Sequence, residues 1–252
     1  MNFKRQFSRF SSKLVLVLMF LMLSLSASCK TEEEKKLVSL FADGKFPFTN
    51  ILGEAPEIAN FILQNKQAFL ADKSHFLDKD FKPSDVLPLE KNDSYVFYRN
   101  DLSLRTPAEN SLRMMGEGAK QDGITLVVSS TFRSYDYQKT VYERNVKQMG
   151  QVAADRESAR PGTSQHQLGT AVDFGSITDE FAETKAGKWL DANAMKYGWS
   201  LSFPQGYEPV TGYRWECWHY RYIGVPACAF QQKWFKNVQQ YMMEFIYNWQ
   251  QL

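Results

Sequence analysis

The sequence predicts a domain of the α+β class, in which helices flank an antiparallel sheet. Short β-rich runs, as at residues 124–129 and 212–223, are mixed irregularly with helical stretches. A parallel sheet would show regular strand–helix–strand units, which this order lacks. The chain also has no internal repeats and no low-complexity tract. We therefore expect one main domain, preceded by an N-terminal region of different character.

Residues 1–28 have the layout of an export signal. Basic residues at positions 4, 5, 9 and 13 precede an apolar run at 14–25. This run is shorter than the ~20 residues that a membrane-spanning helix needs, and it fits the hydrophobic part of a signal peptide. Small residues then lead to Cys29, which resembles the lipobox of bacterial lipoproteins, although Leu25 stands one position early.

We expect residues 1–28 to be removed as a lipoprotein-type signal and Cys29 to be lipidated. The protein would then be exported to the bacterial cell envelope and held at a membrane through this N-terminal lipid anchor. The alternative is an ordinary cleaved signal, with Cys29 as an incidental residue.

Residues 29–64 are interpreted as an N-terminal extension or tether. Thr31 followed by acidic residues at 32–34 is typical of a helix start, and a second helical pattern covers 57–68. The extension would serve as a spacer from the membrane or as a brace on the domain, and the sequence leaves both open. The domain itself is expected at 65–252.

The first half of this domain is predicted from local chemistry. A turn-rich entry at 81–86 precedes a helix at 107–120, where proline suits the first turn and Leu112, Met115 and Ala119 share one face. A buried β-rich strand is expected at 124–129, followed by a helix at 135–149.

The second half alternates in the same irregular way. Small residues at 169–174 predict a strand, and a largely helical stretch at 181–197 ends at Gly198, as a C-cap should. Aromatic residues at 212–223 predict another strand. A final helix is expected at 229–249, after Pro226.

The composition argues against a nucleic-acid partner and against a disulfide-built scaffold. The 30 basic and 28 acidic residues nearly cancel, and no basic stripe or binding motif occurs, so we expect no nucleic-acid partner. Three cysteines are too few for a disulfide-built scaffold. With Cys29 assigned to lipid, Cys217 and Cys228 would either pair or remain buried thiols.

Two of the chain's three histidines lie in motifs that carry metal-binding chemistry. In the first motif, the turn-forming run 161–164 places His166 at the end of a loop, and small residues between His166 and Asp173 allow close approach of a bound group. A histidine near an aspartate is, by itself, more often an ordinary hydrogen-bonded pair than a metal site.

The second motif contains Glu216 and His219. In a regular strand, residues three apart project to opposite faces, so both can face one ligand only if the strand bulges or ends between them. Together the two motifs offer two imidazoles, one carboxylate ligand and a spare carboxylate. A catalytic zinc site needs this inventory of three protein ligands, an open position and a base.

The order of these motifs resembles one enzyme family. Ser-x-His-x-x-Gly-x-Ala-x-Asp at 164–173 and Glu-x-Trp-His at 216–219 are similar to the signature of D-alanyl-D-alanine carboxypeptidases of the VanY type. That family shares a zinc-binding fold with the dipeptidase VanX, endolysin peptidases and the Hedgehog signalling domain. Segments 77–85 and 131–138 resemble further family elements, so the resemblance covers roughly 65–240. Cys217 departs from the usual proline, and Thr131 and Phe132 replace Gly-Tyr, but neither change touches a ligand position.

The resemblance implies a role for each motif residue. It implies Zn²⁺ as cofactor, held by His166, Asp173 and His219. Glu216 would move the proton between the attacking water and the leaving amine. Arg133 would stabilise the oxyanion. Ser164 and Gln138 would contact the substrate, which the resemblance implies to be a peptidoglycan stem peptide ending in D-alanyl-D-alanine.

Three alternatives accompany this reading. A related peptidase could cut elsewhere in the stem, at the L-alanyl-D-glutamate bond, because the family shares ligands while the pocket changes. A zinc-containing binding protein without activity would have no need of Glu216 or Arg133. A lipoprotein with structural zinc would normally show four protein ligands, and Cys217 is the only candidate for a fourth.

Overall fold

The computed structural model describes residues 69–251, which belong to a compact unit formed by residues 65–251. The expected signal, the lipidation site Cys29 and the extension at 29–64 lie outside the described residues. Among residues 69–251, no helix is both long enough and apolar enough to span a bilayer.

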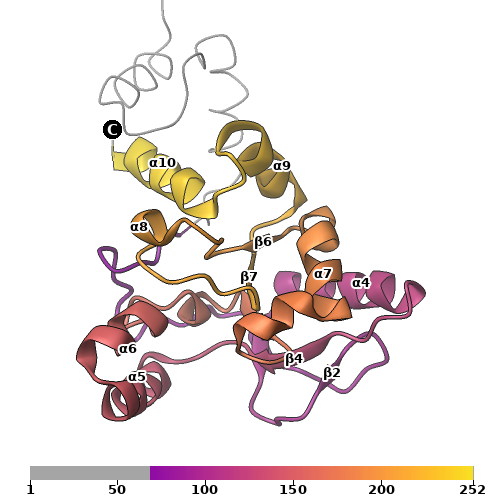
Figure 1. Ribbon diagram of the computed structural model, residues 1–252, viewed down its shortest axis with the longest axis horizontal. Coiled ribbons are helices and arrows are strands. Elements are labelled where there is room, and N and C mark those ends of the chain that lie inside the picture. The colour runs from indigo at the N-terminus through magenta and orange to yellow at the C-terminus, as the bar shows by residue number, and fades with distance from the viewer. Residues whose placement is uncertain (1–68, 252) are drawn as a thin grey trace, which may run out of the picture. The chain divides into compact units, whose positions relative to one another are not determined.

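A five-stranded sheet lies at the centre of the domain (Figure 1). In spatial order its strands are β2 (Val96–Phe97), β4 (Val127–Ser130), β5 (Ala171–Phe174), β7 (His219–Tyr222) and β6 (Trp199–Leu201). The α+β prediction is confirmed, and every neighbouring pair is antiparallel except β2 and β4, which run parallel. A separate antiparallel pair joins β1 (Val86–Pro88) to β3 (Ser103–Arg105).

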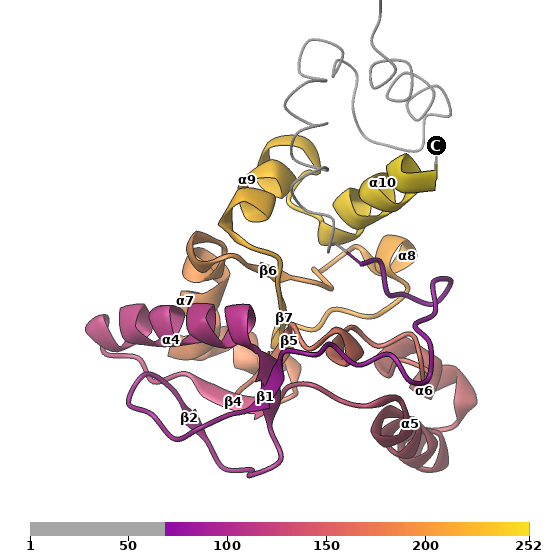
Figure 2. The ribbon, with the colours of Figure 1, turned by 180° about the vertical axis from the view of Figure 1, so that it is seen from behind.

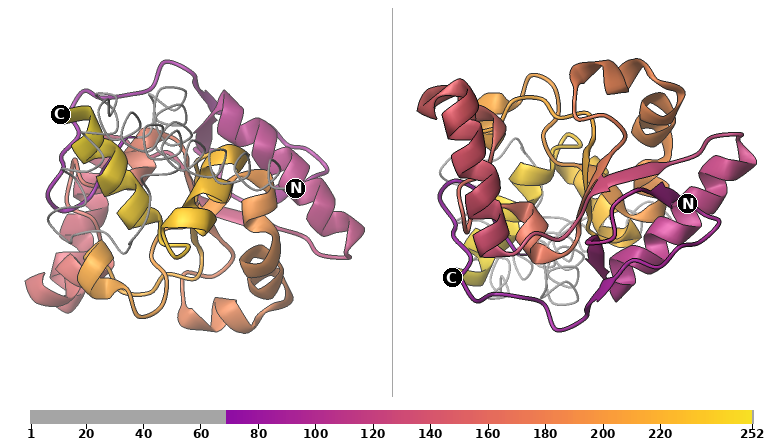
Figure 3. Two further views of the ribbon diagram at one scale, coloured as in Figure 1. Left: turned by 90° about the horizontal axis from the view of Figure 1, so that it is seen from above. Right: turned by 90° about the horizontal axis from the view of Figure 1, so that it is seen from below.

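Helices cover this sheet in groups that lie at different ends of the domain. The helix α4 (Thr106–Gln121) lies away from α5 (Tyr135–Met149) and α6 (Gln151–Glu157), as the front and back views agree (Figure 2). The helix α7 (Lys185–Asn193) follows the short turn η2 (Asp179–Glu183) and precedes η3 (Ala194–Tyr197). The helix α9 (Val225–Trp234) packs against β6, and α10 (Gln239–Gln251) packs against α9 and the short α8 (Glu208–Thr211) (Figure 3).

The main core forms where α4 meets the sheet. Leu112, Met115 and Ala119 are fully buried, which confirms the predicted apolar face of this helix. They belong to one cluster with sheet residues that include Val172 and Phe174. The strands β5 and β7, which carry the last residue of each motif, therefore belong to a sheet that is packed against this core.

Two long elements of the sequence prediction are wrong in extent. The expected strand at 212–223 is reduced to β7, because residues 212–218 form bends, irregular backbone and a turn. The expected helix at 229–249 is two helices, α9 and α10. Lys236 and Asn237 adopt positive φ between them, a conformation that interrupts helical hydrogen bonding. The stretch 181–197 is likewise divided into η2, α7 and η3, and it ends at Gly198 in the left-handed conformation, as predicted.

Candidate active site

Asp173 and His219 are brought together by strand pairing. They are directly opposite partners in the antiparallel ladder of β5 and β7. Directly opposite residues project from the same face of a sheet, so their side chains meet. Asp173 Oδ1 lies 2.9 Å from His219 Nδ1, and both side chains are buried.

His166 reaches the same point from the short turn η1 (Gln165–Leu168). Ser164 caps this turn by accepting a hydrogen bond from the His166 backbone N–H at 3.3 Å. At the other end Gly169 has φ 69°, and a Cβ there would lie 2.8 Å from Val86 Cγ2 and 2.9 Å from Arg105 Cγ. Only glycine fits this tight turn into β5. As a result His166 Nε2 lies 3.2 Å from Asp173 Oδ2.

The three side chains form a cluster whose atoms fit a cation. The outward nitrogen of each imidazole faces an oxygen: His166 Nδ1 lies 2.6 Å from the Thr131 carbonyl, and His219 Nε2 lies 3.2 Å from Gln165 Oε1. Protons on these outward nitrogens leave lone pairs on the inward ones. The inward nitrogens and a carboxylate oxygen of Asp173 lie within 4.8 Å of one another. Two imidazoles held by outer hydrogen bonds, with one carboxylate, are a donor set that suits Zn²⁺.

Burial sets the charge states within this cluster. It lowers the pKa of His166 to about 4, helped by the nearby Arg133, so this imidazole is neutral at pH 7. Burial alone would raise the pKa of Asp173, but His166, His219 and Arg133 outweigh it and hold that pKa well below its usual range. The ligand residues therefore present a carboxylate and at least one neutral imidazole, the forms that bind metal.

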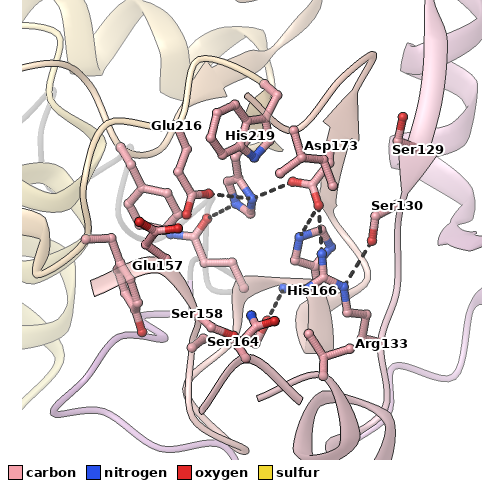
Figure 4. A pocket seen from close by; sticks show the side chains of 18 of the residues that line it. Ser129, Ser130, Arg133, Glu157, Ser158, Ser164, His166, Asp173, Glu216 and His219 are labelled. Atoms are coloured by element: carbon pink, nitrogen blue, oxygen red, sulfur yellow. Dashed lines mark hydrogen bonds and ion pairs between the residues drawn. The ribbon is translucent and has the colours of Figure 1, made fainter. Parts of the chain in front are cut away.

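Glu216 lies in the turn that precedes β7. The His219 N–H donates to the Glu216 carbonyl at 3.1 Å, and the Glu216 N–H donates to the Phe203 carbonyl, also at 3.1 Å. Because the strand begins only at His219, the alternation of strand faces does not separate the two side chains. A Glu216 carboxylate oxygen lies 3.8 Å from His219 Nδ1, and Figure 4 shows both side chains directed into the same space.

The Glu216 carboxyl group carries the opposite pKa shift to Asp173. Burial raises the pKa of Glu216 well above its usual range, and the negative charge of Asp173 adds to this effect. The pKa values of these two neighbouring carboxyl groups are thus shifted in opposite directions, so that Asp173 stays ionised and Glu216 favours its protonated form. Such a division is typical of sites where one acid binds and the other moves a proton.

Arg133 closes the cluster on the side of β4. It follows that strand and immediately precedes Ser134, which caps α5 by accepting from the Tyr137 N–H. Its guanidinium donates to Ser130 Oγ at 3.0 Å, to Gln138 Oε1 at 3.2 Å and to Asp173 Oδ2 at 2.7 Å. These three acceptors fix a permanently charged group at the edge of the metal-binding cluster.

A cavity of about 350 Å³ opens in front of these residues. Its lining includes Arg133, Ser164 and Glu216 together with the three metal-ligand candidates. Gln138 was expected to touch substrate, but it is buried and does not line this cavity. Its amide is used internally, because Oε1 accepts from Arg133 and Nε2 donates to the Ala159 carbonyl at 2.7 Å. Gln138 thus orients Arg133 in this structure.

Three groups at the site were not predicted from the sequence. The Thr131 carbonyl and the Gln165 side chain orient the two imidazoles, and Glu157 lines the cavity beside Glu216. Figure 4 shows Glu157 on the Glu216 side of the cavity. Gln165 stands inside the first motif and could have been noticed there. Thr131 acts through its backbone, and Glu157 lies on α6 outside every motif, so neither left a signal in the sequence.

The remaining histidine and the cysteines lie apart from the ligand cluster. His75 Nδ1 lies 2.8 Å from Asp72 Oδ1, and its ring packs on Tyr247. Cys217 and Cys228 are both buried and unpaired, so the disulfide that the sequence left open is not formed. The Cys217 thiol faces the carbonyls of Thr178 and Asp179 at 3.6 and 3.7 Å, away from a ligand position.

The chain is similar to known proteins in both sequence and fold. Residues 101–225 match the family model described as VanY, D-alanyl-D-alanine carboxypeptidase. The solved structure of the LdcB LD-carboxypeptidase is similar to this chain with a TM-score of 0.62 and 31% identity, covering 69% of this chain and 83% of LdcB. The chain belongs to the VanY family.

Two further proteins are similar to this chain. YodJ of Bacillus subtilis (strain 168), provisionally named a carboxypeptidase, is 34% identical over 173 residues, which are 66% of this chain. The chain spans only 63% of the length of YodJ. The structure of VanY from a VanB-type resistance cassette, a glutamate-to-alanine variant in complex with Zn(II), has a TM-score of 0.58. At 24% identity, over 70% of this chain and 97% of that one, it shows a shared fold.

Proposed function

We propose that this member of the VanY family is a zinc carboxypeptidase that removes the terminal D-alanine from peptidoglycan stem peptides ending in D-alanyl-D-alanine. The observation that carries the proposal is the convergence of His166, Asp173 and His219 beside Glu216, at the edge of a cavity. Three protein ligands with an adjacent free carboxylate are the composition of catalytic rather than structural zinc sites. The family model and the Zn(II)-bound VanY structure support the same reading.

His166 Nε2, Asp173 and His219 Nδ1 would hold the metal. Bound there, Zn²⁺ would supply Lewis-acid chemistry, polarising the scissile carbonyl and activating a water. The chain's own contribution to this state is the orientation of the two rings. The Thr131 carbonyl and Gln165 Oε1 accept hydrogen bonds from the outward nitrogens, so the lone pairs lie on the inward nitrogens.

Glu216 would carry the proton during hydrolysis. Its carboxylate lies beside the ligands and lines the cavity, yet the third ligand position is already supplied by Asp173. Since burial raises its pKa, Glu216 accepts a proton more readily than an exposed glutamate. It would take the proton of the attacking water and release it to the nitrogen of the leaving D-alanine.

Arg133 would bind an oxygen of the substrate. The acceptors Ser130, Gln138 and Asp173 hold its guanidinium at the cavity wall, so little reorganisation is needed when a carbonyl oxygen gains charge. Ser164, buried at the same wall, offers a hydroxyl close to His166. These groups would read the carboxylate end of a short peptide, and the rings of Tyr213 and Trp218 would confine its small side chain.

A second candidate differs only in the bond that is cleaved. LdcB, the solved relative at 31% identity, is named an LD-carboxypeptidase, so it acts on a terminal D-residue that follows an L-residue. The wall of the cavity also includes Arg144 and Met149 of α5. The configuration of the penultimate residue is therefore the property that separates the two candidates.

One experiment tests both. The zinc-loaded protein would be incubated with a stem pentapeptide ending in D-alanyl-D-alanine, with the tetrapeptide in which D-alanine follows an L-centre, and with the C-terminal amide of each. We expect release of D-alanine from the free pentapeptide and cleavage of its amide that is slower by at least about tenfold. The buried donors would lose their charged partner in the amide, at a cost of about 1.5–3 kcal/mol. Faster turnover of the free tetrapeptide would establish the L,D-specific candidate, and equal turnover of free and amidated peptides would contradict both.

A further inference from the structure

The second ligand histidine is backed by a buried row of polar side chains. His219 Nε2 faces Gln165 Oε1 at 3.2 Å, and the same oxygen accepts a hydrogen bond from Ser202 Oγ at 2.7 Å. Behind them lies Gln239, the first residue of α10. Its Oε1 lies 3.5 Å from Gln165 Nε2 and 3.4 Å from Ser202 Oγ. Gln165, Ser202 and Gln239 are all buried. Buried amides are costly unless each hydrogen bond is made, so this row is expected to have a defined polarity.

A backbone carbonyl sets that polarity. Gln239 Nε2 lies 3.4 Å from the Ser200 carbonyl, which can only accept a hydrogen bond. The amide of Gln239 must therefore point its nitrogen at Ser200 and its oxygen at Gln165. Gln165 in turn must present its nitrogen to Gln239 and its oxygen to Ser202 and His219. Reversing any one of these amides would place two acceptors, or two donors, against each other.

We propose that Gln239 and Gln165 act as positioning residues that keep the proton of His219 on Nε2 and thereby reserve Nδ1 for the metal. An imidazole nitrogen that faces an amide oxygen must carry hydrogen, so the opposite nitrogen holds the lone pair. That opposite nitrogen, Nδ1, is the one that faces Asp173. The inference rests on the metal site of the proposed function and extends it to α10, which lies beyond the family match at 101–225.

The two ligand histidines differ in how they are held. His166 is oriented by the Thr131 carbonyl, a backbone group that no substitution removes. Within residues 69–251, the hydrogen bonds to the His219 ring come from side chains, so its tautomer can be changed by replacing them. This contrast gives the proposal a sharp test, because the two rings can be followed separately in one protein.

Two variants, Gln165→Met and Gln239→Met, remove the amides while keeping similar volume. Gln165→Glu keeps an acceptor toward His219. The matched control is Gln167→Met in the same turn, since Gln167 is also fully buried but donates to the Asp78 and Phe81 carbonyls rather than to a ligand. Zinc affinity would be measured by chelator competition. The imidazole N–H protons of the zinc-loaded proteins would be followed by ¹⁵N-edited NMR and their exchange with solvent.

We expect Gln165→Met to weaken zinc binding about 10–100-fold, the usual range for an outer hydrogen-bond partner of a ligand histidine. Gln239→Met should act in the same direction by a smaller factor. In both variants the Nε2–H of His219 should exchange faster while the Nδ1–H of His166 stays protected. Gln165→Glu should keep the Nε2–H of His219 protected, and Gln167→Met should keep the wild-type affinity within a few-fold.

The outcomes separate this proposal from the one it rests on. A wild-type protein that takes up no zinc would contradict the proposed metal site itself. If the wild type binds zinc, and Gln165→Met binds it equally well with a protected His219 Nε2–H, the positioning role is wrong and the metal site stands. An equal loss of affinity in Gln167→Met would also overturn the role, since it would show a general disturbance of the turn.

Discussion

Three adjacent ionisable side chains at the site are driven to different charge states by one buried environment. His166 has its pKa lowered by burial, Asp173 has its pKa held down by the surrounding cations and imidazoles, and Glu216 has its pKa raised by burial and by Asp173. A carboxylate next to the neutral imidazole of His166 attracts a divalent cation, whereas a carboxyl group that favours its proton does not compete for it. The environment thus separates ligands from base.

Metal content tests the ligand assignment at this scale. We expect the wild-type protein to hold about one Zn²⁺, and His166→Ala or His219→Ala to lose it, because each removes one of three donors that converge within 4.8 Å. His75→Ala is the control, since His75 pairs with Asp72 and lies outside the cluster. Elemental analysis after dialysis gives the answer. Near-stoichiometric zinc in both ligand variants would contradict the assignment.

Glu216 should respond differently from the ligands. Glu216→Gln keeps the size of the side chain but removes the base, so zinc should remain bound while kcat falls by roughly 10² or more. Glu180→Gln, at an exposed position that does not line the cavity, is the matched control and should keep wild-type kcat. Loss of zinc from Glu216→Gln would show instead that this carboxylate is a ligand.

At the scale of elements, the turn that carries His166 is braced from outside the sheet. Arg105, at the end of β3, packs its side chain against Gly169 and donates to Asp85 Oδ1 at 2.7 Å. Its backbone N–H also donates to the Gly169 carbonyl at 2.9 Å, and the Thr106 N–H donates to the Asp85 carbonyl at 3.1 Å. The start of α4 and the loop after His166 are therefore joined through the pair of Asp85 and Arg105.

This brace predicts a pH-dependent contribution to stability. The hydrogen bond from Arg105 lowers the pKa of Asp85. A carboxyl group with a lowered folded-state pKa stabilises the fold above its unfolded pKa, near 3.9, and this contribution disappears as pH falls through the lower folded value. Asp85→Asn should lower the free energy of unfolding by about 0.5–1 kcal/mol at pH 7, since the pair is partly exposed and screened.

Denaturant unfolding at several pH values measures this difference. The gap between wild type and Asp85→Asn should be constant above about pH 5 and should close below pH 4. The control Asp80→Asn, in the same segment but exposed, should show little change at any pH. A gap that is independent of pH would mean that Asp85 acts through packing rather than charge.

Elements defined by local chemistry were predictable from sequence, and those defined by distant partners were not. The helix α5 begins after the cap Ser134 and ends at Met149, before the C-cap Gly150, and its predicted bounds match the structure. The turn at Glu216 depends on a hydrogen bond to the Phe203 carbonyl, so the sequence predicted a longer strand there. The break between α9 and α10 contains no glycine or proline. Lys236 and Asn237 adopt the positive φ there, so the residue types around the break did not predict it.

The site shows the same division. The candidate metal ligands could be identified from sequence, because the residue types and their spacing within the motifs are those of metal-binding side chains. The partners that orient them act through a carbonyl at Thr131 or through a contact between η1 and α10, at Gln165 and Gln239. Gln138 was predicted to bind substrate, but its burial and its bond to Arg133 follow from packing between α5 and the loop at Ala159.

At the scale of the whole molecule, the residues that would set the position of the domain in the cell lie outside the described part. A substrate in the cell wall can be reached by a secreted protein or by one held at the membrane surface. We propose that the protein is exported and anchored through a lipid on Cys29. The basic residues at 4–13, the apolar run at 14–25 and the small residues before Cys29 support this proposal.

Substitution of the lipidation site gives the direct test. A diacylglyceryl group supplies the two acyl chains that stable anchoring needs, so the wild-type protein should fractionate with membranes and Cys29→Ser should be released. The matched control is Cys228→Ser, because Cys228 is buried in α9 and takes no part in anchoring. Mass spectrometry of the wild-type N-terminus should find the lipid on Cys29. An unmodified N-terminus beyond Cys29 would show that residues 1–28 direct secretion without an anchor, leaving the metal site and its chemistry unaffected.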